Sequence, residues 1–298
     1  MSLAPIVLFV FNRPEHTLKT LEALSNNYLA NQSDLIVFCD GPKASISEKE
    51  LNDIQEVRKI VKNQKWCKSL EIRESQLNRG LANSIIEGVT EIVNNYGKVI
   101  VLEDDLLTSP FFLRFMNDGL NKYEKSKNVY SINGYMYPIE TNLAKSVLLP
   151  LTSTWGWATW RESWGALDLN MIGHEELISN PFLKQRFNIA DYDYIHMLSY
   201  KNNSWGIKWY FSVFSHNGLG VFPTKSLISN IGFDGSGTNC ESDSIQTQLS
   251  QKDIPIELGL TINLSFYSKY LNYFRVENKL NKNIIYRLKR YLVNKLFI

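Results

Sequence analysis

Three consecutive carboxylates, Glu103, Asp104 and Asp105, follow the short apolar run 99–102. Carboxylates on adjacent positions repel one another unless a cation or hydrogen bonds compensate their charge. A hard divalent ion such as Mg²⁺ or Mn²⁺ prefers oxygen ligands and keeps coordination positions for diphosphate oxygens. In an extended strand, Glu103 and Asp105 would point to one side and Asp104 to the other. A solvated acidic loop is the alternative interpretation.

Two further groups of polar residues follow apolar runs of the same kind. Asn12 and Arg13 come after the run 6–11, and Asp40 comes after the run 35–39. Short continuous apolar runs are typical of strands that are covered on both faces. Each group of candidate residues is therefore expected at the end of a strand.

Helices are predicted between these strands. A stripe of leucines follows Pro14, Ser47 and Glu50 form a capping box, and a third helix is expected over about 81–95. The expected strands are 6–11, 35–39, 69–73 and 99–102. This alternation predicts an α/β fold with a mostly parallel, doubly wound sheet, in which ligands gather beyond the carboxyl ends of the strands. The candidate residues are thus expected around one crevice.

The second half of the chain has a less regular pattern. From about residue 128 onward Gly, Ser, Asn and Trp become frequent, and strand-like pieces occur near 129–133, 147–151 and 219–222. No internal repeat and no low-complexity linker separates the halves. We therefore expect one domain with an elaborated second half.

The composition is that of a globular protein. The chain has 298 residues, of which 44% are hydrophobic and 21% charged, so it can bury a sizeable core. Its net charge of +2 gives no argument for a nucleic-acid partner. Cys39, Cys67 and Cys240 show neither a disulfide framework nor a zinc spacing, so we expect reduced thiols in a cytosol. We expect no signal peptide and no transmembrane segment.

Several segments carry a resemblance to a known family. They are Pro5 to Pro14, Val37 to Asp40, Asn78 to Leu81, Val101 to Leu106, Ser109 to Phe112 and Val129 to Gly134, with Thr154 to Trp160 and Asn203 to Cys240 later in the chain. On these segments the sequence resembles the GT-A glycosyltransferases, in particular the N-acetylglucosaminyltransferase I type and bacterial family 2-like sugar transferases. The resemblance implies a GT-A type, Rossmann-like sheet, mostly parallel and flanked by helices, with an acceptor-side second half.

The resemblance also implies a division of the chain. A glycosyltransferase domain is expected over 1–255, with a nucleotide-sugar half at about 1–134 and an acceptor half at about 135–255. Residues 256–298 are expected to form a basic extension with an amphipathic helix. Its last part, 279–298, carries six basic side chains and no acidic one. Since the net charge of the whole chain is +2, the residues 1–278 have a net charge of −4. This helix could rest on an anionic membrane, or pack on the domain or on a partner.

Roles for individual residues follow from the resemblance. Asp105 would bind the metal directly, while Glu103 and Asp104 would contact ribose, donor sugar or metal-bound water. The turn after the first strand and Asp40 would hold the base and ribose, and Arg79 would lie near the base or the diphosphate. The predicted donor-binding residues are Phe11, Asn12, Arg13, Asp40, Arg79, Glu103 and Asp104. The alternatives are that the arginines are surface charges and that Asp40 only forms a turn.

The catalytic base is not given by the resemblance. Relatives of the acetylglucosaminyl type place an acidic pair between two tryptophans, but here Trp205 and Trp209 enclose no carboxylate. An inverting transferase needs one carboxylate to take the proton of the acceptor hydroxyl. Glu162 and Asp193 are the two equal candidates. Asp191, Asp168 and Asp234 are weaker ones, and each of these residues could instead be a surface acid.

Tryptophans are concentrated in one region. Six of the seven lie between 155 and 209. Their rings stack on sugars and their N–H groups donate to hydroxyls, so Trp155, Trp157 and Trp205 are expected to bind the acceptor; core packing is the alternative. The loop 230–238 is rich in glycine and could close over the donor. The four histidines show no ligand spacing.

The sequence therefore predicts a metal-dependent inverting glycosyltransferase. It would move a sugar from a nucleotide diphosphate donor, expected to be a UDP-sugar, to a glycan or lipid-linked saccharide acceptor in bacterial surface polysaccharide synthesis. Mn²⁺ or Mg²⁺ is the expected cofactor, and the expected location is cytoplasmic, with peripheral membrane contact through the tail. A sugar-phosphate nucleotidyltransferase would show a glycine-rich loop after the first strand, which Phe11 to Pro14 is not. A non-catalytic carbohydrate-binding protein would not explain the acidic triplet.

Overall fold

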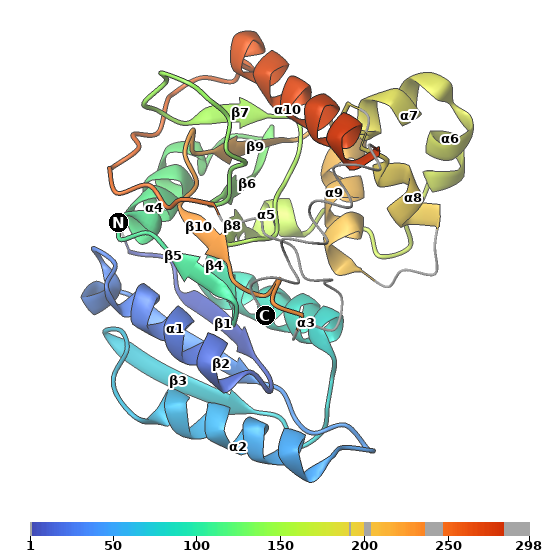
Figure 1. The fold of residues 1–298 in the computed structure, drawn as a ribbon. Coiled ribbons are helices and arrows are strands. Elements are labelled where there is room, and N and C mark those ends of the chain that lie inside the picture. Colours follow the sequence, from blue (N-terminus) through green and yellow to red (C-terminus); the bar gives the residue numbers. More distant parts are fainter. Residues whose placement is uncertain (1, 191, 200–203, 236–246, 283–298) are drawn as a thin grey trace.

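The computed structural model describes residues 2–190, 192–199, 204–235 and 247–282, and in this part of the chain helices surround an eight-stranded sheet (Figure 1). Its strands are β1 (Ile6–Val10), β2 (Asp34–Cys39), β3 (Ser69–Glu74), β4 (Lys98–Glu103), β6 (Val129–Asn133), β7 (Val147–Leu149), β8 (Trp157–Trp160) and β9 (Leu219–Phe222). Their order across the sheet is β3-β2-β1-β4-β8-β6-β9-β7. A second, two-stranded sheet pairs β5 (Leu106–Thr108) with β10 (Ile228–Asn230).

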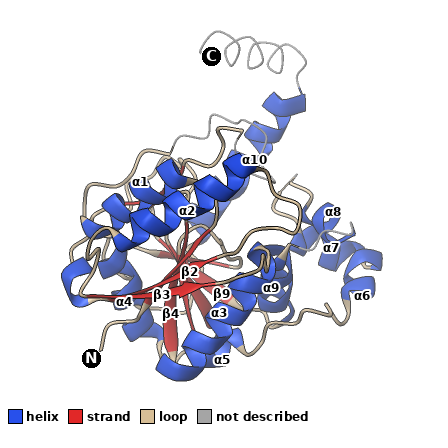
Figure 2. Cartoon of the chain, turned by 90° about the horizontal axis from the view of Figure 1, so that it is seen from below, coloured by secondary structure: helices blue, strands red, loops and turns tan. Residues whose placement is uncertain are grey.

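Helices cover both faces of the large sheet. They are α1 (Pro14–Ser25), α2 (Glu48–Lys62), α3 (Leu81–Tyr96), α4 (Phe112–Tyr123), α5 (Arg161–Trp164), α6 (His174–Ser179), α7 (Pro181–Phe187), α8 (Tyr194–Ser199), α9 (Trp205–Ser215) and α10 (Leu264–Lys282), with a 3-10 turn η1 (Ala30–Gln32). Buried residues of α1, α2 and α4 pack on one face, and those of α3, α5 and α9 on the other. Figure 2 shows α1 and α2 across the strands from α3 and α5.

The first half of the chain has the predicted α/β alternation. β1 pairs in parallel with β2 and β4, and β2 pairs in parallel with β3. Local signals set the helix ends: Pro14 starts α1, the capping box of Ser47 and Glu50 starts α2, and Gly97 ends α3 with a φ of 79°. The predicted mostly parallel α/β sheet with flanking helices is thus confirmed.

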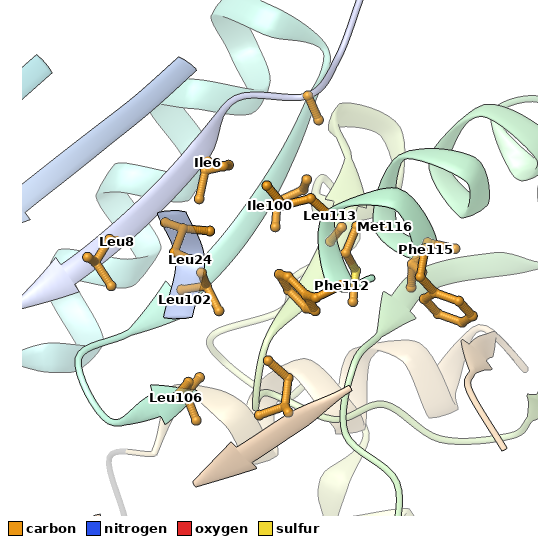
Figure 3. Packing of buried hydrophobic residues seen from close by; sticks show 14 of the residues in the cluster. Ile6, Leu8, Leu24, Ile100, Leu102, Leu106, Phe112, Leu113, Phe115 and Met116 are labelled. Atoms are coloured by element: carbon orange, nitrogen blue, oxygen red, sulfur yellow. The ribbon is translucent and has the colours of Figure 1, made fainter. Parts of the chain in front are cut away.

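The core divides along the alternation of β1. Ile6 and Leu8 face α1, where Leu24 packs with the same cluster, whereas Val7 and Phe9 face α3. Figure 3 shows the first of these clusters, in which side chains of β1 and β4 meet Leu24 and the residues of α4. Because both faces of β1 are covered, its five residues are all buried, as the apolar run predicts.

The strand β8 reverses the chain direction inside the sheet. It runs antiparallel to β4, with Trp160 opposite Lys98 and Trp157 opposite Val101. The segment before β8 therefore reaches the edge where β4 ends, and the segment after β8 lies at the opposite edge. Apolar periodicity did not predict β8. All four of its residues are buried, so the strand shows no alternation of buried and exposed positions.

An aromatic cluster contains buried residues of the five helices α6, α7, α8, α9 and α10 and of the strands β7 and β9. It includes Phe187 of α7, Tyr210 of α9 and the buried side chains Phe266, Tyr270 and Phe274 of α10. The first turns of the predicted extension 256–298 are therefore packed on the rest of the chain, and Ile256 is buried. The basic tail lies outside the described residues from 283 onward. In the described helices no stretch is both long and apolar enough to cross a membrane.

Close packing of α3 on the sheet depends on Gly88. A Cβ there would lie 2.9 Å from two ring atoms of Phe9 and 3.1 Å from Phe38. We expect Gly88→Val to lower the free energy of unfolding by about 1–3 kcal/mol, because overpacking forces the rings from their positions. Urea denaturation measures this, with Asn95→Val on the exposed side of α3 as the control. Equal stability of the two variants would contradict this packing.

Candidate active site

A cavity of about 450 Å³ lies at the carboxyl ends of β1, β2 and β4, and we call it the sheet-edge cavity. Its lining includes Phe11, Asn12, Arg13, Asp40, Glu103, Asp104 and Asp105. These residues come from turns that directly follow three parallel strands, as the sequence predicted. The structure therefore brings together six of the seven predicted donor-binding residues and the predicted metal ligand.

Arg13 is held between two carboxylates of the acidic triplet. Its Nη2 donates to Asp104 Oδ1, and it donates to Asp105 Oδ2 at 2.9 Å. Burial opposes the positive charge, but the two carboxylates outweigh this and raise the pKa of Arg13. Pro14 begins α1 directly after Arg13, so the start of this helix fixes the backbone from which the guanidinium reaches the triplet.

The triplet does not continue the alternation of β4. The strand ends at Glu103, and Asp104 and Asp105 lie in the turn before β5. Thr20 of α1 donates its hydroxyl to the carbonyl of Asp104 at 2.8 Å and anchors this turn. Because the chain turns, Asp104 and Asp105 both reach Arg13, and the predicted opposite orientation of these two residues is wrong.

Negative charge in the triplet is only partly compensated. Burial, reinforced by Asp105 and Asp104, raises the pKa of Glu103 to about 8. Burial raises the pKa of Asp104 to about 6, although Arg13 acts in the opposite direction. No described residue donates a hydrogen bond to the Glu103 carboxylate. One guanidinium thus faces three carboxylates, and this donor set suits a hard cation.

A metal ion in this site would receive few protein ligands. Within the described residues no three His, Cys, Asp or Glu side chains are placed to hold an ion together. Mg²⁺ commonly keeps several waters and uses one or two carboxylates with substrate phosphates. Oxygen donors at Asp105, beside an open cavity, fit that mode of binding.

Asp40 organises the loop that borders the cavity. Its Oδ1 accepts from the backbone N–H groups of Gly41 and Arg79, both at 2.8 Å. Its Oδ2 accepts from Asn78 Nδ2 and Gly80 N, both at 3.0 Å. The sequence predicted contact of Asp40 with the donor; the structure shows a carboxylate with four protein donors at the cavity wall.

The side chain of Arg79 does not line the sheet-edge cavity. It is 55% exposed and its Nη2 lies 2.8 Å from Glu87 Oε2 on α3. Only the backbone of Arg79 takes part in the loop, through Asp40. The structure therefore leaves this predicted donor-binding side chain outside the cavity.

Aromatic rings line the same cavity as the triplet, and Phe9 lies beside Glu103 on the neighbouring strand. Phe9 and Phe38 stack with ring centroids 5.0 Å apart, and both line the cavity with Phe11. Lys43 lies over the ring of Phe11, with its Nζ 5.8 Å from the centroid. This combination of flat apolar surface and positive charge suits a planar, anionic ligand such as a nucleotide.

The segment 231–234, from the second half of the chain, packs against Asp105 and Arg13. Gly232 lies against Asp105 and Arg13 so closely that a Cβ would overlap the carboxylate. Ile231 N donates to the carbonyl of Asp105 at 2.9 Å, and His16 Nε2 lies 3.1 Å from Asp234 Oδ2. No local pattern predicted a role for His16, because its partner Asp234 is remote in the chain. Residues 236–238 of the predicted loop 230–238 lie outside the described residues.

The three predicted acceptor tryptophans differ in position. Trp155 and Trp205 line the sheet-edge cavity. Trp157 has 0% exposure and packs among Trp164, Trp205 and Trp209. Its ring offers no surface to a ligand, so its expected acceptor role is corrected to a core role; all of β8 is covered on both faces.

The candidate bases are also separated by the fold. Glu162 follows β8 and lies beside the start of β4, because Arg161 N donates to the carbonyl of Gly97 at 2.9 Å. Six residues of extended chain, about 20 Å, separate that edge from Glu103. The structure does not bring Glu162 to the cavity. Asp168 accepts from the N–H groups of Asn170 and Ile172, and Asp191 lies outside the described residues.

Asp193, unlike Glu162, lies next to residues that line a cavity. It is exposed at the start of α8, where its Oδ1 accepts from His196 N at 3.2 Å, and its neighbours Tyr192 and Tyr194 line a second cavity. Asp234 pairs with His16 and follows Gly232, which lines the sheet-edge cavity, by two residues; the ring of its neighbour Phe233 meets that of Trp155 with centroids 5.4 Å apart.

Solved GT-A glycosyltransferase structures match most of the chain. Residues 1–349 of S. aureus TarS in complex with UDP match 75% of this chain at 11% identity and a TM-score of 0.38. Mouse xyloside xylosyltransferase 1 matches 72% at 8% identity and 0.35, and glucosyl-3-phosphoglycerate synthase from Mycobacterium tuberculosis, with Mn²⁺, UDP-glucose and phosphoglyceric acid, matches 55% at 12% and 0.30. The matched parts span 59%, 81% and 58% of those chains, and 36% of a longer TarS chain. No protein-family model and no curated protein matches the sequence.

The hydrogen bonds of Asp40 give a direct test of the loop. In Asp40→Asn an NH₂ group would face backbone N–H donors, and two acceptor positions would be lost. We expect the free energy of unfolding to fall by about 2–3 kcal/mol, since hydrogen bonds to charged groups are lost. The amide protons of Arg79 and Gly80 should also exchange faster. Asp53→Asn, at a side chain that accepts no hydrogen bond from a described residue, is the control and should change neither measurement.

Proposed function

We propose that the protein is a metal-dependent glycosyltransferase that uses a nucleotide diphosphate sugar as donor. The observation that carries this proposal is the composition of the sheet-edge cavity. Its lining combines three carboxylates and a single guanidinium with three phenylalanine rings and Lys43. A volume of about 450 Å³ lies within the ~300–1,000 Å³ of small-molecule sites.

The donor would lie across the cavity from the aromatic wall to the triplet. The base would contact Phe11 and its neighbours, and the ribose would lie near Asn12 and Asp40. The diphosphate would reach Arg13, and Asp105 would hold Mn²⁺ or Mg²⁺, with Glu103 and Asp104 near ribose, donor sugar or metal-bound water. When bound, the metal ion would neutralise the negative charge of the leaving diphosphate. Arg13 would then exchange carboxylate oxygens for phosphate oxygens, to which a guanidinium also donates charge-assisted hydrogen bonds.

Sugar transfer would proceed by direct displacement with inversion. The acceptor hydroxyl oxygen forms a bond to the anomeric carbon while the bond from that carbon to the diphosphate oxygen breaks and its electron pair leaves with the diphosphate. The hydroxyl proton passes to a carboxylate on the acceptor side. Among the described residues that are candidates for the base, Asp193 and Asp234 each lie within two residues of a residue that lines a cavity. A glycan or lipid-linked saccharide in surface polysaccharide synthesis, reached from the cytoplasmic face of a membrane, remains the proposed acceptor.

Metal dependence tests the role of Asp105. We expect Asp105→Asn to weaken the Mn²⁺-dependent binding of UDP by more than about 100-fold. Removing a residue that only hydrogen-bonds to a metal ligand already lowers metal affinity or activity by about 10–100-fold. Isothermal titration calorimetry with Mn²⁺ and with EDTA measures this. Asp253→Asn, a matched change at an exposed residue paired with Arg114, should bind UDP as the parent does. Unchanged Mn²⁺-dependent affinity in Asp105→Asn would refute the assignment.

The base can be identified by comparing three isosteric variants. Either Asp193→Asn or Asp234→Asn should lower sugar transfer by about 10²–10⁴-fold with nearly unchanged UDP affinity, because a general base contacts the acceptor and not the nucleotide. Glu162→Gln is the control and should transfer at the parental rate. Parental rates in both aspartate variants would exclude both residues, and a product with retained anomeric configuration would exclude direct displacement.

A further inference from the structure

A second cavity, of about 230 Å³, has six tyrosines in its lining, and we call it the tyrosine cavity. The six are Tyr135, Tyr137, Tyr192, Tyr194, Tyr210 and Tyr270. They come from the segment after β6, from the start of α8 and the residues just before it, and from within α9 and α10. No Asp, Glu, Lys, Arg or His is among the described residues of its lining. The walls are therefore polar at hydroxyl groups but carry no charged side chain.

The tyrosine cavity adjoins the sheet-edge cavity. Thr154, Trp155, Ser204 and Gly206 line both. Trp155 stands at this junction with its ring edge-on to Tyr135, with centroids 4.6 Å apart, and to Phe233, with centroids 5.4 Å apart. At Gly206 a Cβ would approach Thr154 Cγ2 to 3.2 Å, so these two residues of the shared lining pack closely. A ligand in one cavity is thus beside a ligand in the other.

The rings are fixed by one another, while several hydroxyl groups are left for a ligand. Tyr137 meets Tyr135 edge-on with centroids 5.0 Å apart and meets Phe274 at 4.8 Å. Tyr210 donates its hydroxyl to the carbonyl of Phe187 at 2.8 Å. The hydroxyls of Tyr137, Tyr194 and Tyr270 form no hydrogen bond with any described residue.

These hydroxyl groups stay protonated. Burial raises the pKa values of Tyr137 and Tyr270 well above the usual range, and it also raises that of Tyr194. Each phenol can therefore both donate and accept a hydrogen bond near neutral pH. Aromatic faces with neutral hydroxyls match a ring that has C–H groups on its faces and hydroxyls on its edge, whereas a carboxylate or phosphate would find no charge partner.

We propose that the tyrosine cavity binds an uncharged sugar ring of the acceptor, next to the donor at the Trp155 junction. This inference rests on the proposed function and names the acceptor's chemical class. The volume is below the ~300–1,000 Å³ typical of sites for drug-sized ligands, so the cavity holds one ring and not a long oligosaccharide. Any lipid or further glycan of the acceptor extends out of it.

The probes for this site are methyl glycosides. Saturation-transfer NMR on the full chain, with saturating UDP and the diamagnetic ion Mg²⁺, should detect at least one of methyl β-glucoside, methyl β-galactoside and methyl β-N-acetylglucosaminide. Methyl β-glucuronide should bind at least about tenfold more weakly than the best of these, because its carboxylate would be buried without a partner. If no neutral glycoside binds up to about 20 mM, or the glucuronide binds as well, the inference is overturned.

A conservative double variant locates the bound ring. Tyr137→Phe with Tyr194→Phe should weaken glycoside binding about 30-fold, as two neutral hydrogen bonds are lost, while UDP affinity stays parental. Tyr96→Phe, at an exposed tyrosine of α3, is the matched control. If the double variant does not fold, Tyr194→Phe alone should lose about fivefold. Parental glycoside affinity in a folded variant overturns the assignment.

Measuring UDP binding beside glycoside binding separates this inference from the proposed function on which it rests. If UDP does not bind but neutral glycosides do, and the tyrosine variants lose them, the proposed function fails and the saccharide site stands. If UDP binds and expels the glycoside, the glycoside occupies the sheet-edge cavity and the inference fails while the proposed function stands. Simultaneous binding of both is the expected result.

Discussion

Adjacent carboxylates at the end of a buried strand must be compensated by positive charge, because burial and mutual repulsion both oppose their ionisation. Here Glu103, Asp104 and Asp105 meet one guanidinium, that of Arg13. The rest of the site follows from this constraint. The start of α1 positions Arg13, Thr20 of the same helix holds the turn at Asp104, and Gly232 allows the second half of the chain to cover the pair. The negative charge that Arg13 leaves uncompensated is what a divalent cation would balance, and the same cation would hold a diphosphate beside the triplet.

The two halves of the chain contribute different chemistry to adjoining spaces. The parallel half supplies a charged cavity with an aromatic wall, and the second half supplies a cavity of neutral phenols. The antiparallel strand β8 connects them, because its direction brings Thr154 and Trp155 to the edge where β4 ends. A charged donor and a neutral acceptor ring would thus be kept in separate environments that meet at the site of transfer.

Sequence reasoning predicted the features that depend on local pattern. Apolar runs predicted β1, β2 and β4, and Asn12, Asp40 and Asp105, which follow them, do line one cavity. Its errors have physical causes. Burial of Trp157 and the remote position of Glu162 both follow from the reversed direction of β8, which apolar periodicity does not encode. His16 and Asp234, and the tyrosines between 135 and 270, meet only through tertiary packing, so no local signal identifies them.

Binding of a diphosphate to the acidic triplet through a divalent cation can be measured by titrating the full chain with UDP and with UMP, each with Mn²⁺ and with EDTA, in a calorimeter. We expect Mn²⁺ to raise the affinity for UDP at least about tenfold and to change that for UMP much less, because a diphosphate offers the ion more oxygen ligands than a monophosphate. Equal affinities for UDP and UMP that do not respond to Mn²⁺ would contradict this mode of binding.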